Sequence, residues 1–242
     1  MYTVEEVESL AFIGTPYLYE DLCNIYPLTV GDLLALQKKY DIYLRLLTMD
    51  KNFIAKIFLD RKLEVEVLPT PLDYLLNCCK LDDNFLLELE KGFSTFIKEE
   101  VTILCDLKQI VIGEPEEKRF LNESNFRNFQ DILRLQNKIK TEFIPENESE
   151  KARYFREKRE FRDEVKRKQE SAKAPSFSNL LSALCTYGIG ITPFNIKDLS
   201  IYSFYSLVSS NRNKERYDIE MHYLYAGADP KKLNPKYWIT NS

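Results

Sequence analysis

The amino-acid sequence predicts a mainly α-helical protein, made of helical units with one small β-hairpin and one long charged helix between its N- and C-terminal parts. Apolar residues make up 44% of the 242 residues, which is enough for a packed core and too many for a disordered chain. Only 7 Gly and 10 Pro are present, whereas strand-rich folds need many turns. Many apolar residues also recur at helical spacing. These observations favour a helical fold over an all-β one.

Four helices are expected in the N-terminal part. They are expected over residues 30–48, over residues 51–60, from Thr70-Pro71, and after Asp82 or Asp83. Thr29 can accept hydrogen bonds from the first free N–H groups of the first helix, and the leucines that follow fall largely on one face. Proline suits the first helical position, so Pro71 marks the start of the third helix. These segments predict a compact N-terminal helical unit.

A small β-hairpin is expected near residues 101–112, as the only sheet of the protein. Val101–Leu104 and Gln109–Ile112 are short β-branched runs separated by four residues, and Gly113 follows the second run. A further helix is expected from about residue 123 to residue 140, because phenylalanine and leucine side chains define one apolar side there.

Residues 146–175 differ from the rest of the chain in charge. Between Lys151 and Lys173 there are ten Lys or Arg and five Asp or Glu, and apolar residues are sparse. A helix with so narrow an apolar side does not belong in a core, so an exposed charged helix is predicted. We therefore expect an N-terminal domain over residues 1–145, a charged linker or arm over 146–175, and a C-terminal helical domain over 176–242.

The C-terminal domain is expected to contain three helices. The first begins at Ser176 and is broken at Gly188, the second follows Asp198, and the third covers about residues 213–226. Gly227 is expected to end the last helix, since glycine readily takes a left-handed conformation at that position. The tail beyond it is expected to be extended and anchored by its aromatic residues.

No catalytic or metal-binding constellation is recognisable. His222 is the only histidine and falls within a predicted helix among aromatic residues, which favours a structural role over a catalytic one. The five cysteines form no Cys-x-x-Cys pair, which favours reduced thiols in the core over zinc ligands or disulfides. Gly188 and Gly190 lack the third glycine of a dinucleotide-binding loop. The expectation is a protein that is no enzyme, with no cofactor and no metal.

The basic segment is the best candidate for nucleic-acid binding. Arg153, Arg156 and Arg159 could neutralise phosphates, yet acidic residues interleave with them at i,i+3 and i,i+4 spacings. Such spacing favours pairing within a solvated helix, and the net charge of −4 gives no strong overall attraction for nucleic acid. Nucleic acid is therefore not expected as a partner, and an arm that contacts an acidic protein is the favoured interpretation.

The sequence also predicts a location. No stretch approaches ~18 uninterrupted apolar residues, as a membrane-spanning helix would require. The N-terminal residues carry three Glu and lack the basic region of a signal peptide. We therefore expect a cytoplasmic protein without a membrane partner.

The C-terminal sequence carries a recognisable pattern. It consists of Asp198, Leu199, Ser200, Tyr202 and Tyr205 on one helix, then a second helix, an Ala226-Gly227 turn, Lys236 and Trp238. Together with the order of the preceding segments, this pattern resembles small proteins encoded in tail-gene clusters of phages that infect Gram-positive bacteria, often described as tail assembly chaperones. The resemblance covers mainly residues 100–242.

The resemblance implies a non-enzymatic chaperone in the cytoplasm of the bacterial host. It would bind the tape measure protein and shield its apolar helices until tail tube subunits polymerise around it. On this expectation the candidate partner-binding residues are Arg153, Arg156, Arg159, Tyr202, Tyr205 and Trp238. Two alternatives stay open: a structural component of the virion, such as a connector or baseplate subunit, and a nucleic-acid-binding regulator. Self-association also stays open.

Overall fold

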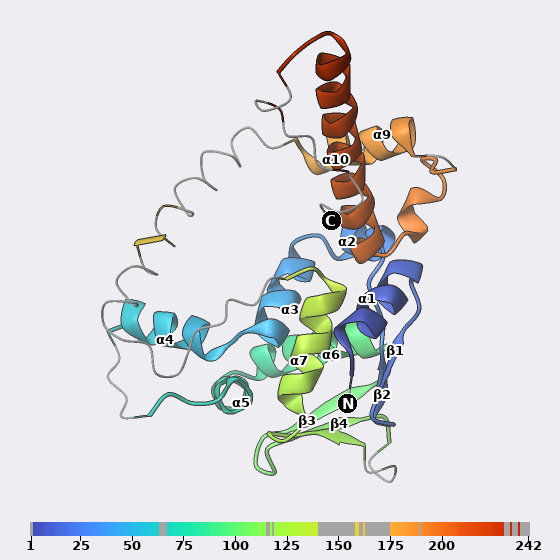
Figure 1. The fold of residues 1–242 in the computed structure, drawn as a ribbon. Coiled ribbons are helices and arrows are strands. Elements are labelled where there is room, and N and C mark those ends of the chain that lie inside the picture. Colours follow the sequence, from blue (N-terminus) through green and yellow to red (C-terminus); the bar gives the residue numbers. More distant parts are fainter. Residues whose placement is uncertain are drawn as a thin grey trace. The chain divides into compact units, whose positions relative to one another are not determined.

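The computed structural model describes residues 2–62, 67–114, 117, 119–139, 158–159, 162, 175–188, 190–229, 233 and 237. The described chain is mainly α-helical, which confirms the predicted fold class (Figure 1). It divides into two compact units. Unit 1 consists mainly of Met1–Ile139 and Lys197–Ser209, and unit 2 consists of Lys140–Ile196 and Ser210–Asn241.

The three expected domains therefore stay a prediction. Most of the expected arm, residues 146–175, lies outside the described residues. Residues 197–209, which the sequence analysis assigned to the C-terminal domain, are grouped with unit 1.

The helices of unit 1 are α1 (Val4–Ile13), α2 (Val30–Leu36), α3 (Lys38–Thr48), α4 (Lys51–Asp60), α5 (Pro71–Leu81), α6 (Asp83–Ile97), α7 (Phe126–Gln136) and the first residues of α10 (Ile201–Tyr225). Side-chain caps mark the starts of α1, α2, α4, α5 and α6, whereas α3 and α7 begin without one. The Thr29 hydroxyl accepts a hydrogen bond from the Asp32 N–H at 3.1 Å, and the Asp32 carboxylate in turn accepts one from the Thr29 N–H. This reciprocal capping box satisfies N–H groups that a helix start leaves without partners.

The single helix predicted over residues 30–48 is in fact two helices. Gln37 separates α2 from α3 with φ 51° and ψ −124°, a conformation that glycine adopts far more easily. Its N–H still donates to the Leu33 carbonyl at 2.9 Å, which completes the last turn of α2. Neither glycine nor proline occurs at this break, so nothing in the residue pattern indicates it.

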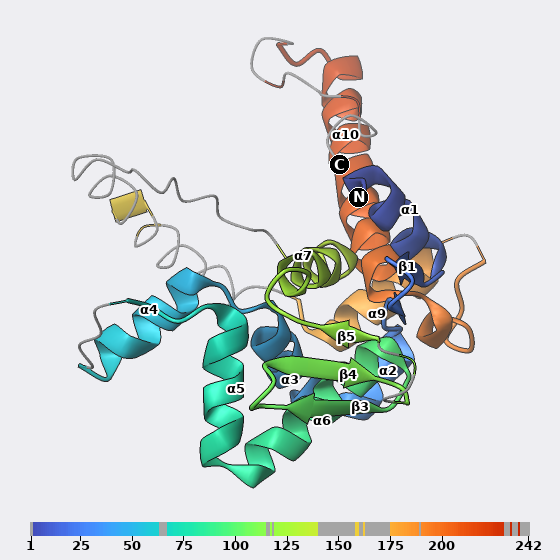
Figure 2. The ribbon, with the colours of Figure 1, turned by 90° about the horizontal axis from the view of Figure 1, so that it is seen from below.

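The predicted hairpin is present with the predicted strands. β3 (Val101–Leu104) pairs antiparallel with β4 (Gln109–Ile112). The expectation that this hairpin is the only sheet is wrong. β5 (Phe120–Leu121) adds a third strand, so that β4 lies between β3 and β5 (Figure 2), and a separate pair is formed by β1 (Tyr17–Tyr19) and β2 (Cys23–Ile25).

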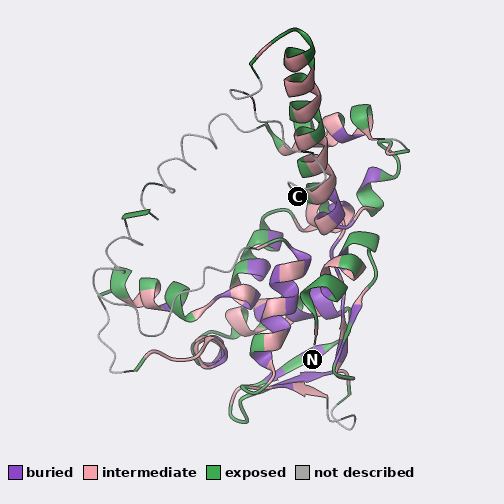
Figure 3. Cartoon of the chain, in the orientation of Figure 1, coloured by how far each residue is buried: buried purple, intermediate pink, exposed green. Residues whose placement is uncertain are grey.

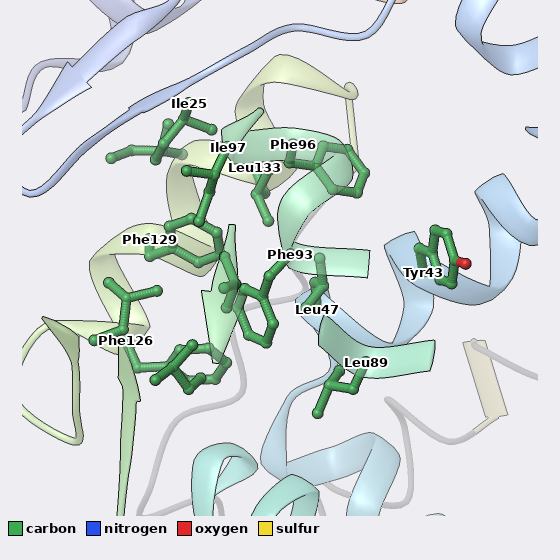
Figure 4. Packing of buried hydrophobic residues seen from close by; sticks show 14 of the residues in the cluster. Ile25, Tyr43, Leu47, Leu89, Phe93, Phe96, Ile97, Phe126, Phe129 and Leu133 are labelled. Carbon is green, nitrogen blue, oxygen red and sulfur yellow. The ribbon is translucent and has the colours of Figure 1, made fainter. Parts of the chain in front are cut away.

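The core of unit 1 is built around phenylalanines from two helices. Phe93 of α6 lies 5.8 Å, between ring centroids, from Phe129 of α7, and Phe126 stacks on Phe129 at 6.2 Å. Leu47 of α3 and Ile25 of β2 belong to the same larger cluster of buried residues, and all five side chains are buried (Figure 4). Aromatic pairs in such tilted and offset arrangements add about 0.5–1.5 kcal/mol each to the stabilisation from burial.

Polar side chains of α7 donate hydrogen bonds to the end of α3 beside this core. Gln130 Nε2 donates to the carbonyls of Leu47 and Met49 at 2.9 and 3.0 Å. Arg134 donates to the Thr48 carbonyl through Nη2 at 2.6 Å. These buried donors satisfy carbonyls that the end of α3 leaves without intrahelical partners.

Unit 2 contains α9 and the rest of α10. Ser176 caps α9 (Phe177–Tyr187) as predicted, because its hydroxyl accepts a hydrogen bond from the Asn179 N–H at 3.2 Å. α10 is one continuous helix of 25 residues where two helices were predicted. The junction contains neither glycine nor proline, so no residue there breaks the helix. Gly227, with φ 90°, follows its last turn as predicted.

Candidate functional site

The start of α10 is attached to the end of α1 by two serines. Ser200 caps α10, because its hydroxyl accepts a hydrogen bond from the Ser203 N–H at 3.0 Å. The same hydroxyl donates to the Ala11 carbonyl at 2.6 Å, and the Ser203 hydroxyl donates to the Phe12 carbonyl. Both serines are buried, so each of these bonds replaces one that water cannot make.

The starts of α10 and α2 are also paired through their backbones. The Ile201 N–H donates to the Leu28 carbonyl at 2.8 Å, and the Val30 N–H donates to the Leu199 carbonyl at 2.9 Å. Gly31 permits this close approach, because a Cβ at that position would lie 3.2 Å from the Lys197 carbonyl oxygen. The segment that carries the Asp198-Leu199-Ser200 pattern is therefore an anchor of α10 within unit 1.

Tyr202 is the first of the candidate residues within this anchor. The ammonium of Lys138, just after α7, lies 4.5 Å from the centre of the Tyr202 ring, which is a cation–π contact. Burial, followed by the nearby Glu8 carboxylate, raises the pKa of Tyr202 to about 12. Burial also lowers the pKa of Lys138. Tyr202 thus links α10 to residues of α1 and to the end of α7.

Tyr205 lies one turn further along α10 and is less enclosed. Its ring packs edge-to-face against Phe204 with centroids 5.2 Å apart, and the side chain is 40% exposed. Burial of its hydroxyl and the Asp41 carboxylate of α3 raise its pKa. The structure therefore brings Tyr202 and Tyr205 together on one element, and binding of a partner by either residue stays a prediction.

The other candidate residues are described only in part. Arg159 is helical and exposed, and it belongs to unit 2. Arg153, Arg156 and Trp238 lie outside the described residues. The protein-contacting role of the charged segment therefore also stays a prediction.

Large apolar side chains of unit 2 are exposed to solvent. Leu184 and Ile196 are the buried hydrophobic residues among those described in this unit. The exposed set is 47–87% accessible and consists of Tyr187, Phe194, Ile219, Tyr223, Tyr225 and Tyr237. Figure 3 accordingly shows α9 and the later turns of α10 as mostly intermediate or exposed. Aromatic side chains are enriched at the cores of protein-binding surfaces, so these residues are candidates for contact with a partner.

None of these exposed residues is among the partner-binding candidates predicted from the sequence. One signal was present. Ile219 and Tyr223 lie on one side of α10, whereas Tyr217, Leu224 and Tyr225 lie around the rest of the helix, so the apolar residues do not form one stripe. A helix with scattered apolar residues cannot bury all of them against one neighbour.

Among the described residues, no group of three or more His, Cys, Asp or Glu side chains is placed to hold a metal ion. His222 lies in α10, as predicted, and is exposed. None of the described helices is long and apolar enough to cross a membrane.

The C-terminal part of the chain matches a known family model. Residues 166–242 match the YomV second domain. This is a Bacillus phage-type protein family, so over about a third of its length the chain resembles phage proteins. The matched range includes α9, the serine anchor, Tyr202, Tyr205 and the exposed side chains of unit 2. No curated protein and no solved structure matches the chain.

Proposed function

We propose that the protein is a non-enzymatic assembly factor of phage tails, a chaperone that binds the tape measure protein and assists assembly of the tail tube. The observation that carries this proposal is the exposed apolar surface of unit 2, which lies within the range matched to a phage-type family. The resemblance of the Asp198–Tyr205 pattern to tail assembly chaperones supports the same function. It acts, on this proposal, in the cytoplasm of the host.

The chemistry of the exposed set fits a helical apolar partner. Tyrosine side chains provide large contact areas at a small cost in conformational entropy, and their hydroxyls tolerate water when the partner is absent. Tyr223 and Ile219 are both exposed and four residues apart on α10, so they are neighbours on one side of the helix and can contact such a partner together. Contacts of this size are individually weak, and many copies along a long tape measure protein would bind through their combined number.

The proposal is tested by following the protein through a phage infection. A tagged copy is purified from infected cells and from mature particles, and the associated proteins are identified by mass spectrometry. We expect the tape measure and tail tube proteins to co-purify from the lysate, and we expect the tagged protein to be absent from the particles. A stoichiometric amount in mature particles would instead identify a structural virion component.

A matched pair of variants connects this experiment to the surface. Tyr223→Ser and Ile219→Ser together remove apolar area from exposed positions, so folding should change little while tape measure recovery falls. Lys214→Ser, also exposed on α10, is the control and should leave recovery intact. Recovery of nucleic acid with a steep loss at higher salt, in place of tail proteins, would favour the regulator alternative.

A further inference from the structure

Helix α5 and the turn between β3 and β4 are joined along their length by two ion pairs. Lys108 Nζ lies 2.6 Å from Asp73 Oδ1, and Lys80 Nζ lies 2.9 Å from Asp106 Oδ1. Asp73 is in the first turn of α5 and Lys80 is in its last turn, so the strand turn follows the helix from one end to the other. Within unit 1 these two segments therefore lie side by side.

One cysteine precedes each partner of the second ion pair. Cys79 comes before Lys80 and is buried, and Cys105 comes before Asp106 and is partly buried against the same core. Burial and, next, the charge of a neighbouring Cys105 thiolate raise the pKa of Cys79 to about 12. The Lys80–Asp106 ion pair and the effect of Cys105 on Cys79 both indicate that the two thiols are neighbours across the interface between α5 and the turn.

We propose that Cys79 and Cys105 form a reversible disulfide when the protein meets a peroxide, and that this bond staples α5 to the β3–β4 turn. Both cysteines are free thiols in the structure, which is the reduced state of the pair. Cys105 is the more accessible thiol and reacts first. The inference concerns unit 1 and does not depend on the proposed function.

The reaction balances with hydrogen peroxide as the oxidant. The Cys105 thiolate attacks one peroxide oxygen, the O–O bond breaks, and Cys105 sulfenic acid and one water form after proton transfer. The Cys79 sulfur then attacks the sulfenic sulfur, and the S–O bond breaks. Its oxygen leaves as a second water with the Cys79 proton, so two thiols lose two electrons and two protons to one peroxide. A dithiol reductant reverses the change.

Cys78 provides a matched control from the same helix. It is adjacent to Cys79 but points elsewhere, because successive helical residues are about 100° apart. Burial raises the pKa of Cys78, whereas its hydrogen bond with Tyr74 and the charge of Arg61, neither of which acts on Cys79, oppose that rise. Cys78→Ser should therefore leave the disulfide intact, whereas Cys105→Ser should abolish it.

The test treats the full-length protein with hydrogen peroxide, blocks remaining thiols with an alkylating reagent, and maps disulfides by mass spectrometry without reduction. We expect a peptide joining Cys79 to Cys105 in the natural sequence and in Cys78→Ser. Because the bond closes a loop of about 27 residues, the melting temperature should rise by on the order of 5–10 °C and return after reduction. Cys105→Ser should show neither change.

Three results would overturn the inference. The first is oxidation of Cys105 to sulfinic acid while Cys79 remains a free thiol, shown by its alkylation once the protein is unfolded. The second is a disulfide that contains Cys78, and the third is a disulfide that joins two chains. Since Cys105 is only partly buried, its serine variant should fold, so the absence of a bond there can be separated from misfolding by its unchanged melting temperature without oxidant.

Discussion

Gln37 has a backbone conformation that is sterically strained for any residue with a Cβ atom. With φ 51° and ψ −124° it lies in a region where a Cβ is strained, at a cost of about 1–3 kcal/mol. Glycine removes the strain but gains freedom in the unfolded chain, so the net gain is smaller. Gln37→Gly should therefore raise the free energy of unfolding by about 1 kcal/mol in urea denaturation. Gln37→Ala keeps the Cβ and should show no gain, and an equal gain in both variants would contradict the strain.

Neighbouring side chains keep the carboxyl group of Glu88 in its charged form to unusually low pH. Its carboxylate accepts hydrogen bonds from Lys39 and Lys91, and from the Tyr43 hydroxyl at 2.9 Å. These hydrogen bonds, that of Lys39 first, lower its pKa to about 2. The pKa of Glu88 in the folded protein therefore lies below its value of about 4.3 in the unfolded chain. The charged carboxylate contributes its full stabilisation of the folded state above about pH 4.3, and this contribution is lost as the pH falls toward 2.

This sign gives a prediction for acid unfolding. Glu88→Gln should flatten the decrease of melting temperature between about pH 4.5 and pH 2, because glutamine does not titrate. Lys39→Met should leave the carboxylate with fewer donors and raise its folded pKa, so the decrease should be smaller and should end at higher pH. A Glu88→Gln curve parallel to that of the natural sequence would show that other groups determine the acid limb.

His222 carries the prediction about catalysis. It is exposed on α10, and surface substitutions of this kind usually change stability by less than about 0.5 kcal/mol. His222→Gln should thus leave both the melting temperature and tape measure recovery unchanged. Complete loss of recovery in a folded His222→Gln protein would contradict the non-enzymatic proposal.

At the scale of elements, strand β3 lies at the edge of its sheet. An edge strand presents N–H groups without strand partners, which invites pairing with other chains. The Glu90 carboxylate of α6 accepts the Ile103 N–H at 3.0 Å and so covers part of that edge. Helix α6 thereby supplies the hydrogen bond that a further strand would otherwise supply.

Removal of this cover should affect both stability and association. Glu90→Ala leaves the partly buried Ile103 N–H without a partner, which costs about 1–3 kcal/mol in the free energy of unfolding. Glu90→Gln keeps an acceptor oxygen and should cost less. Denaturant unfolding measures the first effect, and light scattering at high protein concentration measures self-association through the exposed edge. Equal costs in the two variants would mean that charge, not the hydrogen bond, matters.

The elements differ in how well their residues predict them. The β3–β4 hairpin was predicted strand by strand, because both strands are β-branched runs bounded by polar residues. The β1–β2 pair was missed, since its strands have three residues each and its turn contains Glu20 and Asp21, both at positive φ, instead of the usual asparagine and glycine. The continuity of α10 was missed because serine and asparagine at its middle suggested an end.

The candidate site was predictable only to the level of its helix. Tyr202 and Tyr205 were placed on one helical element from local spacing. Their contacts with Lys138 and Asp41 join residues far apart in the chain, and a single sequence contains no sign of such pairs. The attachment of Ser200 to α1 was likewise not predictable. The surrounding sequence is the same whether the Ser200 hydroxyl only caps α10 or also donates to the Ala11 carbonyl.

For the whole molecule, the charged segment carries a prediction about the rate of association with a partner. Charge reversal of Arg153, Arg156 and Arg159 to Glu should barely alter the melting temperature if the segment is an exposed arm. It should weaken binding to the tape measure protein mainly by slowing association, and the deficit should shrink at high salt. Reversal of the interleaved Glu157, Glu160 and Glu164 to Lys is the matched control and should not slow association.

Three measurements on the triple arginine variant separate the interpretations: the melting temperature, the association rate, and binding to random-sequence DNA. Lost DNA binding with intact tape measure binding would contradict the arm hypothesis and support the nucleic-acid regulator. A large fall in melting temperature would place the segment in a core instead.

The attachment of α10 to α1 also has a consequence for synthesis on the ribosome. Residues up to Ile139 emerge first, but the hydrogen bonds that Ser200 and Ser203 donate to the Ala11 and Phe12 carbonyls cannot form until both serines emerge. The segment ends at Ser209, 70 residues after Ile139 (209 − 139), and at roughly 5–20 residues per second these take about 4–14 s to translate. During that interval the surface that Ile201 and Phe204 later cover is exposed on the nascent chain, and host chaperones have time to bind it.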